Sequence, residues 1–260
     1  SFPELPAPHQ CSAVAWKNTK RGAVLFKTDD GPGFPPGDTE ETVVQRRLAT
    51  KAVFDTAVGK THRVMGVGEL GKLWIEVGFN DQGLCVGHTS GRPVLGSQEG
   101  RGVPQHLFPA LVLRHCATCE EAVDFARKYP VAGKGVNIAV ADRNGHLVAL
   151  EKCGRHTGRR SRYDLVYVVN HYLNPAMLNE IQSQVPDFLK SSYYANSDAR
   201  AAFLDKRIAR IAQLSDRDPA EQLAVLMEHA HGGICQHGMK DEGLWTNYAA
   251  FIQPSAKTME

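Results

Sequence analysis

Cys11 is the residue of this sequence with the clearest capacity for covalent chemistry. It begins a short apolar stretch that runs to Trp16, and it follows a proline-rich segment, residues 1–10, that cannot form a helix or pair regularly in a sheet. This arrangement is typical of a cysteine that becomes the first residue of a mature enzyme after a preceding peptide is removed. A terminal cysteine carries its own base, because a free α-amine titrates near pH ~8 and can accept the thiol proton.

Two other positions favour catalysis over the alternative that Cys11 is simply a small buried residue on an edge strand. Asp30 ends the second predicted strand, so a hairpin that begins at Cys11 returns this carboxylate toward the start of the first strand, where it would hold a terminal ammonium or orient a ligand. Asn170 ends a short apolar strand, and an amide donor there suits a developing oxyanion. Taken singly, Asp30 is better explained as a turn former, and Asn170 is equally well explained as a strand cap.

A zinc site is a second chemical possibility. The candidate ligands are Cys116, Cys119, His229, His231, Cys235 and His237. The Cys-x-x-Cys pair has no matching second pair, and histidines commonly gather where a helix ends before a glycine-rich turn. We therefore expect no metal and no other cofactor, and keep a zinc-dependent hydrolase as the less favoured alternative that metal analysis of the purified protein would test.

Other catalytic motifs carry little weight. The glycines of residues 66–71 match the spacing of a dinucleotide-binding loop, but a predicted strand follows them where such a loop requires the N-terminus of a helix. The sequence contains neither the GxSxG motif of serine hydrolases nor the HExxH motif of zinc peptidases.

The composition is that of a folded protein with one large or two small domains, since 42% of the 260 residues are hydrophobic and 22% are charged. A net charge of +2 does not indicate a nucleic-acid or membrane partner, and we expect the basic run of residues 155–162 to form a solvated loop. No apolar stretch approaches the roughly 20 residues of a membrane span, and residues 1–10 do not resemble a signal peptide. We therefore expect a cytoplasmic protein whose six cysteines are reduced thiols.

Strand and helix patterns alternate along the chain. Strands are predicted at residues 11–17, 22–28, 62–68, 73–79, 83–88, 135–141, 146–151, 165–169 and 245–252, and helices from Pro104, at 119–128, 197–214 and 219–230. Antiparallel sheets with helices outside them satisfy this order without a crossover connection. The sequence stops where a final hairpin strand is expected to begin, so we expect the natural protein to continue past Glu260 or to lack its end here.

The chain resembles the acyl-coenzyme A:isopenicillin N acyltransferase-like branch of the N-terminal nucleophile (Ntn) hydrolases, over most of residues 11–260. The matching segments are Cys11-Ser12-Ala13-Val14, Gly78-Phe79-Asn80 with Gly83-Leu84, Gly102-Val103-Pro104, Asn144-Gly145 with Leu150-Glu151, and Val169-Asn170-His171. The family is related more distantly to bile-salt hydrolases and penicillin V acylase.

This resemblance implies an α+β fold with four αββα layers, two antiparallel sheets flanked by helices. It also implies that residues 1–10 are a pro-segment or linker, that residues 11–260 form the Ntn-hydrolase domain, and that the chain cleaves itself before Cys11. Cys11 would be the nucleophile and its freed amine the base. Asp30 would orient that amine, Asn170 would donate to the oxyanion, and the strand at His88 and Thr89 would add a backbone N–H to the same hole.

The implied activity is hydrolysis or transfer of an acyl group from a small-molecule linear amide or thioester, through an acyl-enzyme. Possible partners are the cleaved pro-segment, as a separate subunit, and further copies of the chain. Gln10 stands where the family usually has glycine before the nucleophile. The alternative from another class is a non-catalytic relative that retains the fold as a binding module.

Overall fold

The computed structural model describes residues 10–32, 51–70, 74–95, 101–161, 164–228, 233–236, 244–253, 255 and 258–259. The strands of one sheet, sheet A, are β1 (Gln10–Asn18), β2 (Gly22–Pro32), β11 (Leu165–Val168), β12 (Leu244–Gln253) and β13 (Thr258–Met259). Those of sheet B are β3 (Lys51–Thr56), β4 (Val64–Glu69), β5 (Ile75–Asn80), β6 (Cys85–Gly91), β7 (Val103–Pro104), β8 (Val131–Ala141), β9 (Leu147–Gly154) and β10 (His156–Arg160). The helices are α2 (Phe108–His115), α3 (Cys119–Lys128), α4 (Pro175–Gln184), η1 (Pro186–Lys190), α5 (Ser192–Gln213) and α6 (Pro219–Leu226).

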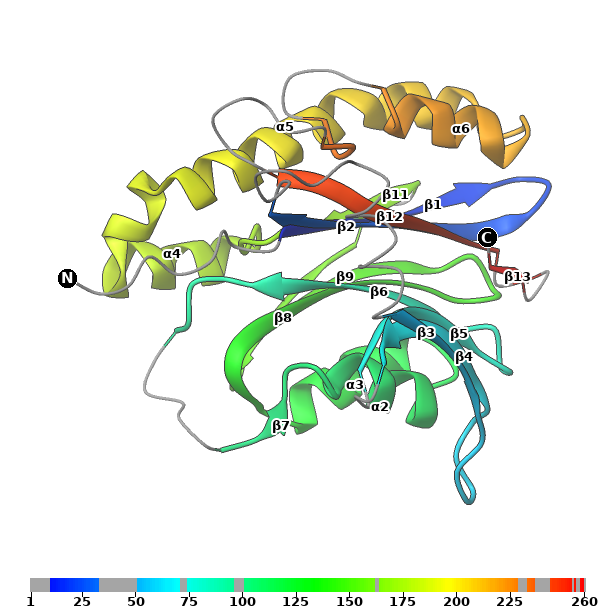
Figure 1. The fold of residues 1–260 in the computed structure, drawn as a ribbon, viewed down its shortest axis with the longest axis horizontal. Helices are drawn as coiled ribbons and strands as arrows, with labels where there is room; N and C mark the ends of the chain where they lie inside the picture. Colours follow the sequence, from blue (N-terminus) through cyan, green and yellow to red (C-terminus); the bar gives the residue numbers. More distant parts are fainter. Residues whose placement is uncertain are drawn as a thin grey trace, which may run out of the picture.

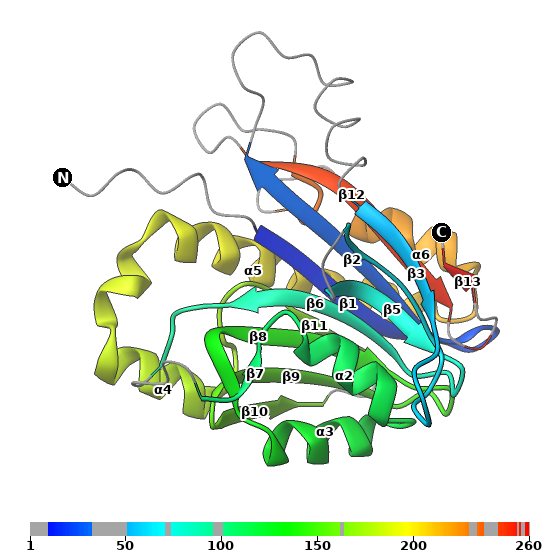
Figure 2. The same cartoon turned by 60° about the horizontal axis from the view of Figure 1, so that its bottom comes forward.

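The two sheets lie face to face with helices outside them (Figure 1). Sheet A has the strand order β11-β1-β2-β12-β13, and sheet B has the order β10-β9-β8-β6-β5-β4-β3, with β7 beside β8. All described pairs of neighbouring strands are antiparallel except the short pair β7–β8. Figure 2 shows β1 and β2 crossing over sheet B near β6, so the two N-terminal strands lie over the middle of the other sheet.

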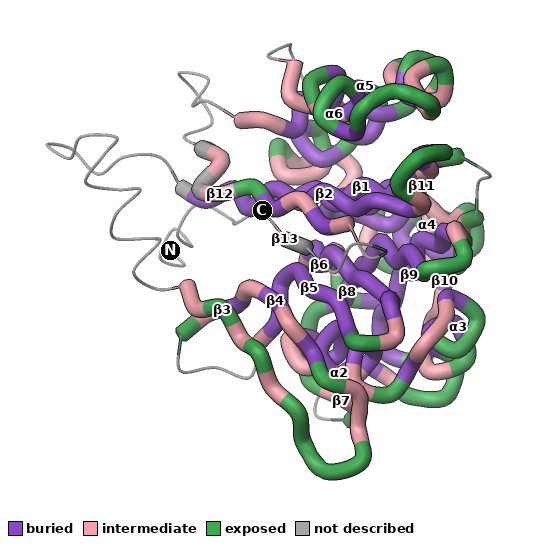
Figure 3. The backbone as a smooth tube through the Cα atoms, turned by 90° about the vertical axis from the view of Figure 1, so that its right-hand side faces the viewer, coloured by how far each residue is buried: buried purple, intermediate pink, exposed green. Residues whose placement is uncertain are grey.

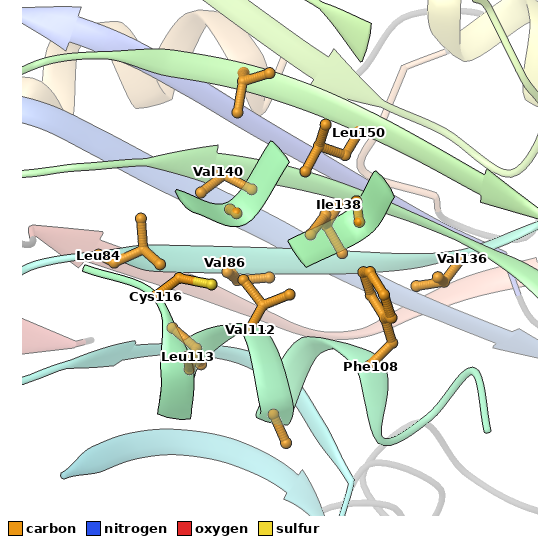
Figure 4. Close-up of a cluster of buried hydrophobic side chains, with 14 of the residues drawn as sticks. Leu84, Val86, Phe108, Val112, Leu113, Cys116, Val136, Ile138, Val140 and Leu150 are labelled. Carbon is orange, nitrogen blue, oxygen red and sulfur yellow. The ribbon is translucent and has the colours of Figure 1, made fainter. Parts of the chain in front are cut away.

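The period of two along each strand divides the side chains between three apolar cores. On the outer face of sheet A, Trp16 and Phe26 pack in one buried cluster with Leu204 of α5 and Leu226 of α6. Between the sheets, residues of β1 and β2 pack against residues of β5, β6, β8 and β9. On the outer face of sheet B, α2 and α3 complete the third core (Figure 4). The predicted αββα arrangement is therefore confirmed.

Small side chains let the sheets approach closely at the level of β1 and β6. Ala13, Ala15 and Ala139 belong to the core between the sheets. A Cβ atom at Gly87 of β6 would lie 2.9 Å from Ala13 Cβ and 3.0 Å from Leu25 Cδ2. A larger side chain at Gly87 would push β1, and with it Cys11, away from sheet B.

The predicted elements agree with most of the structure, and α3 spans the predicted residues 119–128. Pro104 was expected to open a helix, but it lies in β7, and α2 begins at Phe108 with Pro109 in its first turn. Proline fits a first helical turn because its missing N–H is not needed there. The helix expected from Ser197 begins earlier, at Ser192, where the Ser191 side chain caps it by accepting from Tyr194 N.

The basic run at residues 155–162 was expected to be a solvated loop, and this is wrong for β10. Arg160 reaches back to the buried Glu151 of β9, with Nε 2.8 Å from Oε1, and its Nη2 donates to Tyr167 O at 2.5 Å. These contacts stabilise this basic segment as an edge strand of sheet B. The strand β3 was also not predicted, and with the turn that follows it at residues 57–60 it forms one of the more exposed parts of this layer (Figure 3).

The described part of the chain has no helix with both the length and the apolar composition required to cross a bilayer.

Candidate active site

Cys11 lies near the start of β1, directly opposite Asp29 of β2. Because side chains alternate along paired strands, Cys11, Lys27 and Asp29 project toward sheet B, whereas Gln10 and Asp30 project toward α5. The backbone is continuous from Gln10 to Cys11, so the Cys11 nitrogen is a peptide amide in this structure. The geometry below is therefore that of the uncleaved chain.

The Cys11 thiol lies between one acidic and one basic side chain. Its Sγ is 3.5 Å from Asp29 Oδ1, and Lys27 Nζ lies 3.9 Å from the same sulfur. Burial raises the pKa of the thiol, and the positive charge of Lys27 opposes this only in part. Burial alone would lower the pKa of Lys27, but the negative charges of Cys11, Asp29 and Glu76 outweigh it and raise this pKa. With the Gln10–Cys11 bond intact, the thiol is therefore neutral and the lysine is protonated near neutral pH.

A balanced set of charges surrounds this pair on the sheet B side. Lys27 Nζ is 3.8 Å from Asp29 Oδ1 and 3.7 Å from Glu76 Oε2. Lys51 Nζ is 3.6 Å from Asp29 Oδ2 and 2.7 Å from Glu76 Oε1. The Tyr248 hydroxyl donates to Glu76, and its ring centroid lies 5.1 Å from Lys27 Nζ. We call Lys27, Asp29, Lys51, Glu76 and Tyr248 the inner cluster.

Glu76 reaches this cluster because of a β-bulge in β5. Gly68 of β4 pairs with Ile75 and Val67 pairs with Val77, which leaves Glu76 as the extra residue. The bulge allows Ile75 to join the outer core and Val77 the core between the sheets, and it directs Glu76 inward. Burial would raise the pKa of Glu76, but the ammonium groups of Lys27 and Lys51 lower it to about 2.

A second β-bulge, in β12, directs neighbouring side chains of this strand to opposite faces of sheet A. Thr246 pairs with Asp30 and Tyr248 pairs with Asp29, so one residue of β12 is unmatched between them. Thr246 Oγ1 donates to Asp30 Oδ1 at 2.8 Å on the α5 side, whereas Tyr248 joins the inner cluster. Without the extra residue, positions 246 and 248 would face the same way.

On the α5 side, the fully buried Arg200 binds the backbone and side chains around Cys11. Its Nη1 donates to Cys11 O at 2.5 Å and to Ser12 Oγ at 2.8 Å. Its Nη2 donates to Asn170 Oδ1 at 2.9 Å and to Gln10 Oε1. Arg200 therefore fixes the peptide on both sides of the Gln10–Cys11 bond.

Asn170, which follows β11, presents its carboxamide oxygen to the nitrogen of Cys11. The Cys11 N–H donates to Asn170 Oδ1 at 2.7 Å, and Asn170 Nδ2 donates to Ser90 O at 3.1 Å. The backbone N–H of Asn170 donates to Ser197 Oγ of α5 at 3.0 Å. These bonds fix the orientation of the carboxamide, with its oxygen, and not its NH₂ group, toward Cys11.

Asp30 is completely buried and lies on the opposite face of sheet A from the thiol. Its Oδ1 accepts from Thr246, whereas its Oδ2 has no hydrogen-bond partner among the described residues. Burial raises the pKa of Asp30 to about 7, against the opposing charge of Arg200 and the Thr246 hydrogen bond. Asp30 is thus a buried carboxyl group behind Cys11, with one oxygen that no described residue binds.

His88 and Thr89 lie on β6, opposite Ile138 and Asn137 of β8. Thr89 Oγ1 donates to Val169 O at 2.7 Å, which ties β6 to the residue before Asn170. The buried His88 ring packs edge-on against Trp74, with 6.3 Å between ring centroids. Burial, followed by the charge of Lys27, lowers the pKa of His88 to about 3. Thr89 is therefore connected to the Asn170 segment, and the His88 side chain faces away from it.

The sequence analysis did not single out Arg200 or the inner cluster. The sequence does contain a pattern that indicates Arg200. Asn196, Arg200 and Leu204 are spaced by four along the buried face of α5, and an arginine is unusual at a buried position. Lys27 and Asp29 continue the inward face of β2 from Leu25, and the hairpin register places both opposite the start of β1. Glu76 and Tyr248 depend on the bulges and had no such signal.

No group of three or more metal-ligating side chains is found in the described part of the chain. Cys116 and Cys119 are buried in the outer core of sheet B, and Cys119 Sγ donates to His146 O at 3.3 Å. Among the other candidate ligands, His229, His231 and His237 lie outside the described residues.

The fold is shared with several solved structures. A mutant conjugated bile acid hydrolase from Clostridium perfringens has a TM-score of 0.61 and 11% identity, over 94% of this chain and 86% of that one. A Caenorhabditis elegans ortholog of N-acylethanolamine-hydrolyzing acid amidase has a TM-score of 0.56 and 12% identity, over 94% and 93%. Penicillin V acylase from Agrobacterium tumefaciens has a TM-score of 0.54 and 12% identity, over 94% and 80%. These proteins are Ntn hydrolases, and at this identity the likeness concerns the fold.

Comparison by sequence gives the family. A search of curated proteins finds no match to this chain. The profile of the acyl-coenzyme A:6-aminopenicillanic acid acyl-transferase family matches residues 20–259, which is nearly the whole chain. The resemblance inferred from the motifs is confirmed, and the chain belongs to this family of Ntn hydrolases and acyltransferases.

Proposed function

We propose that this protein is a cysteine Ntn hydrolase or acyltransferase that cleaves itself before Cys11. The processed enzyme would then hydrolyse or transfer an acyl group from a linear amide or thioester. The observation that carries the proposal is the separate positioning of the two reactive atoms of Cys11. Its nitrogen is bound by Asn170 Oδ1 at 2.7 Å, while its sulfur lies in the inner cluster, 3.9 Å from Lys27 Nζ.

Self-cleavage would begin with attack of Cys11 Sγ on the carbonyl carbon of Gln10. The amide bond breaks, the acyl group passes to the sulfur, and the former amide nitrogen becomes the free amine of Cys11. Water then hydrolyses the thioester and leaves a carboxylate on Gln10. Arg200, which bonds to Gln10 and to Cys11 O, holds this peptide in place for the reaction.

In the processed enzyme, the amine of Cys11 would accept the thiol proton, and the thiolate would attack the substrate carbonyl. The tetrahedral intermediate expels the amine or thiol product, which takes that proton, and leaves an acyl-enzyme. Water completes hydrolysis, and an acceptor amine completes transfer. Backbone N–H groups at His88 and Thr89 and Asn170 Nδ2 are the proposed oxyanion donors, and Asn170 Nδ2 must then exchange its present partner, Ser90 O.

Asp30 is the proposed anchor of the new ammonium group. Its buried Oδ2 has no hydrogen-bond partner among the described residues, and Asp30 lies beside Cys11 in the strand pair, opposite Gln10. An ammonium group formed there would gain a charged hydrogen bond and would lower the pKa of the carboxyl from its value before cleavage.

Intact-mass measurement and a Cys11→Ser variant test this function. We expect the wild-type chain to lose every residue before Cys11 and to gain the mass of an acyl group with N-acyl amino acids or acyl thioesters. Cys11→Ser should form no thioester. An unprocessed chain whose thiol is inert to iodoacetamide would instead favour a non-catalytic binding module. Full activity with residues 1–10 still attached would exclude the terminal amine as the base.

A further inference from the structure

Lys51, the first residue of β3, connects the two sheets close to Cys11. The strand β3 ends the described strand order of sheet B, yet the ammonium group of Lys51 reaches Asp29 of β2 in sheet A, with Nζ 3.6 Å from Oδ2. The same Nζ lies 2.7 Å from Glu76 Oε1, and it is 5.2 Å from the centroid of the Tyr248 ring. Lys51 is therefore held by two carboxylates and an aromatic ring that come from three different strands.

Both carboxylate oxygens of Glu76 have hydrogen-bond donors other than Lys27. Its Oε1 accepts from Lys51, and its Oε2 accepts from the Tyr248 hydroxyl. Lys27 Nζ lies 3.7 Å from Oε2, which is beyond the usual range of a hydrogen bond. Since Lys51 and Tyr248 satisfy this carboxylate, Lys27 is not required as its hydrogen-bond partner.

Lys27 lies instead between the sulfur and the two carboxylates. Its Nζ is 3.9 Å from Cys11 Sγ and 3.8 Å from Asp29 Oδ1, distances close to that from Glu76. Burial acts to lower the pKa of Lys27, and among the negative charges that raise it, that of the Cys11 thiolate is the largest. Because the attraction of two charges grows as their distance falls, a lysine shared in this way can turn to a newly formed thiolate.

Four further titratable side chains interact with Cys11 or Lys27: Asp30 of β2, His88 of β6, Tyr193 of α5 and Tyr248 of β12. None of the four is a cation near neutral pH, because burial lowers the pKa of His88 to about 3 and raises the pKa of both tyrosines. Arg200 binds Cys11 O from the α5 side of sheet A. Among the described residues, the cations at the two inner carboxylates are therefore lysines 27 and 51.

We propose that Lys51 is a positioning residue for the nucleophile: it neutralises the two inner carboxylates and thereby leaves Lys27 to stabilise the thiolate of Cys11. This proposal rests on the proposed function, in which that thiolate attacks the substrate. With a neutral residue in place of Lys51, the carboxylates of Asp29 and Glu76 would attract Lys27, and the thiolate would lose the ammonium group beside it. Lys51 therefore controls which fraction of Cys11 is ionised and reactive.

Alkylation of Cys11 by iodoacetamide tests this role without a substrate. The rate constant near neutral pH, followed by mass spectrometry of the peptide that contains Cys11, reports the thiolate fraction. We expect Lys51→Met to lower this rate about tenfold. Lys51→Arg, which keeps the charge, should remain within about twofold of the wild type. Adding Glu76→Gln to Lys51→Met removes one of the two carboxylate charges and should restore part of the rate. Lys60→Met, at an exposed position of the turn after β3, is the matched control and should have the wild-type rate.

Urea unfolding of each variant separates a loss of reactivity from a loss of fold. If Lys51→Met folds poorly, the neutral and polar Lys51→Gln should show the same loss of rate. Equal alkylation rates in the wild type and in a folded neutral variant, or an equal loss in a folded Lys51→Arg, would overturn the role of Lys51 and leave the proposed function intact.

The proposed function can fail separately. A chain that forms no acyl-enzyme, but whose alkylation at Cys11 still depends on the charge at Lys51, would overturn the function and support the role of Lys51. A Cys11 thiol that is inert to iodoacetamide in the wild type would overturn both.

Discussion

Two charged side chains around Cys11 favour the proposal that the base is the amine of the cysteine itself. Lys27 is the nearest basic side chain to the sulfur, but its raised pKa keeps it protonated. Glu76 is a poor proton acceptor, because two ammonium groups lower its pKa to about 2. Neither Lys27 nor Glu76 is therefore suited to take the thiol proton, although the charge of Lys27 can stabilise a thiolate. A free α-amine, with a pKa of about 8, can take this proton near neutral pH, and it exists only after cleavage.

Asp30 should make the uncleaved chain less stable as the pH rises. Its pKa is about 7 in the folded chain, above the 3.8 of an exposed aspartate. Between these two pH values the folded state binds a proton that the unfolded state does not, so the free energy of unfolding falls from about pH 4 to pH 7. Urea unfolding of a Cys11→Ala chain, which cannot cleave, should show this fall. The same chain with Asp30→Asn should lose it.

Comparing the two variants is necessary because other carboxylates act in the opposite direction. The pKa of Glu76 is lowered, so Glu76 contributes stability that is lost as the pH falls. This contribution is common to both variants and cancels in their difference. A difference in unfolding free energy that stays constant from pH 4 to pH 7 would contradict the buried, neutral state of Asp30.

At the level of elements, a helix or strand could be predicted from the sequence where neighbouring residues determine it. It was missed where a contact with a residue distant in the sequence determines it. The strands β1, β2, β5, β6, β8 and β9 follow alternating or apolar runs, and α3 follows from its cap at Thr118 and its apolar spacing. Strand β10 was missed because its stability comes from the ion pair of Arg160 with Glu151, which its own sequence does not reveal. The start of helix α4 could have been predicted from the sequence, because Asn174 is a typical N-cap residue and Pro175 is favoured in the first helical turn.

The same distinction applies to the candidate site. Cys11, Asp30 and Asn170 could be selected because each stands near the end of a strand, and the structure places Cys11 against Asn170 and Asp30 on the opposite face of the sheet from the thiol. The inner cluster could not be assembled from sequence, because the bulges at Glu76 and in β12 decide which way its side chains face.

Helix α5 should influence catalysis through Ser197. Its hydroxyl accepts from the Asn170 N–H at 3.0 Å and lies 2.8 Å from His171 Nδ1. Ser197→Ala would leave both buried groups without this partner, at a cost of about 1–3 kcal/mol in stability. If the carboxamide of Asn170 then loses its orientation, kcat should fall by about tenfold, which corresponds to ~1.4 kcal/mol, with KM nearly unchanged.

The control for Ser197 is Ser192→Ala in the same helix, at an exposed position of its first turn. It should leave both kcat and the unfolding free energy close to those of the wild type. A Ser197→Ala enzyme that is destabilised but retains the wild-type kcat would show that Ser197 supports the fold only.

At the scale of the whole molecule, the site lies where three of the four layers meet. Cys11, Asp29 and Lys27 come from sheet A, Glu76 and Thr89 from sheet B, and Arg200 from α5. No pair of these layers contains the complete site. The surroundings of Cys11 therefore depend on the relative position of the two sheets, between which small residues pack in the core.

Gly87→Ala tests this dependence on the distance between the sheets. The added methyl group would lie 2.9 Å from Ala13 Cβ, two residues from Cys11, and 3.0 Å from Leu25 Cδ2. Overpacking of this kind typically costs about 1–3 kcal/mol. We expect a lower free energy of unfolding, measured in urea, and slower cleavage before Cys11, measured as the change of intact mass over time.

Adding Ala13→Gly removes the methyl group on the opposite strand and should restore part of both losses, whereas Ala13→Gly alone should only weaken the core. If the double variant cleaves no faster than Gly87→Ala, the spacing between β1 and β6 does not control the nucleophile, and the effect must come from β6 itself.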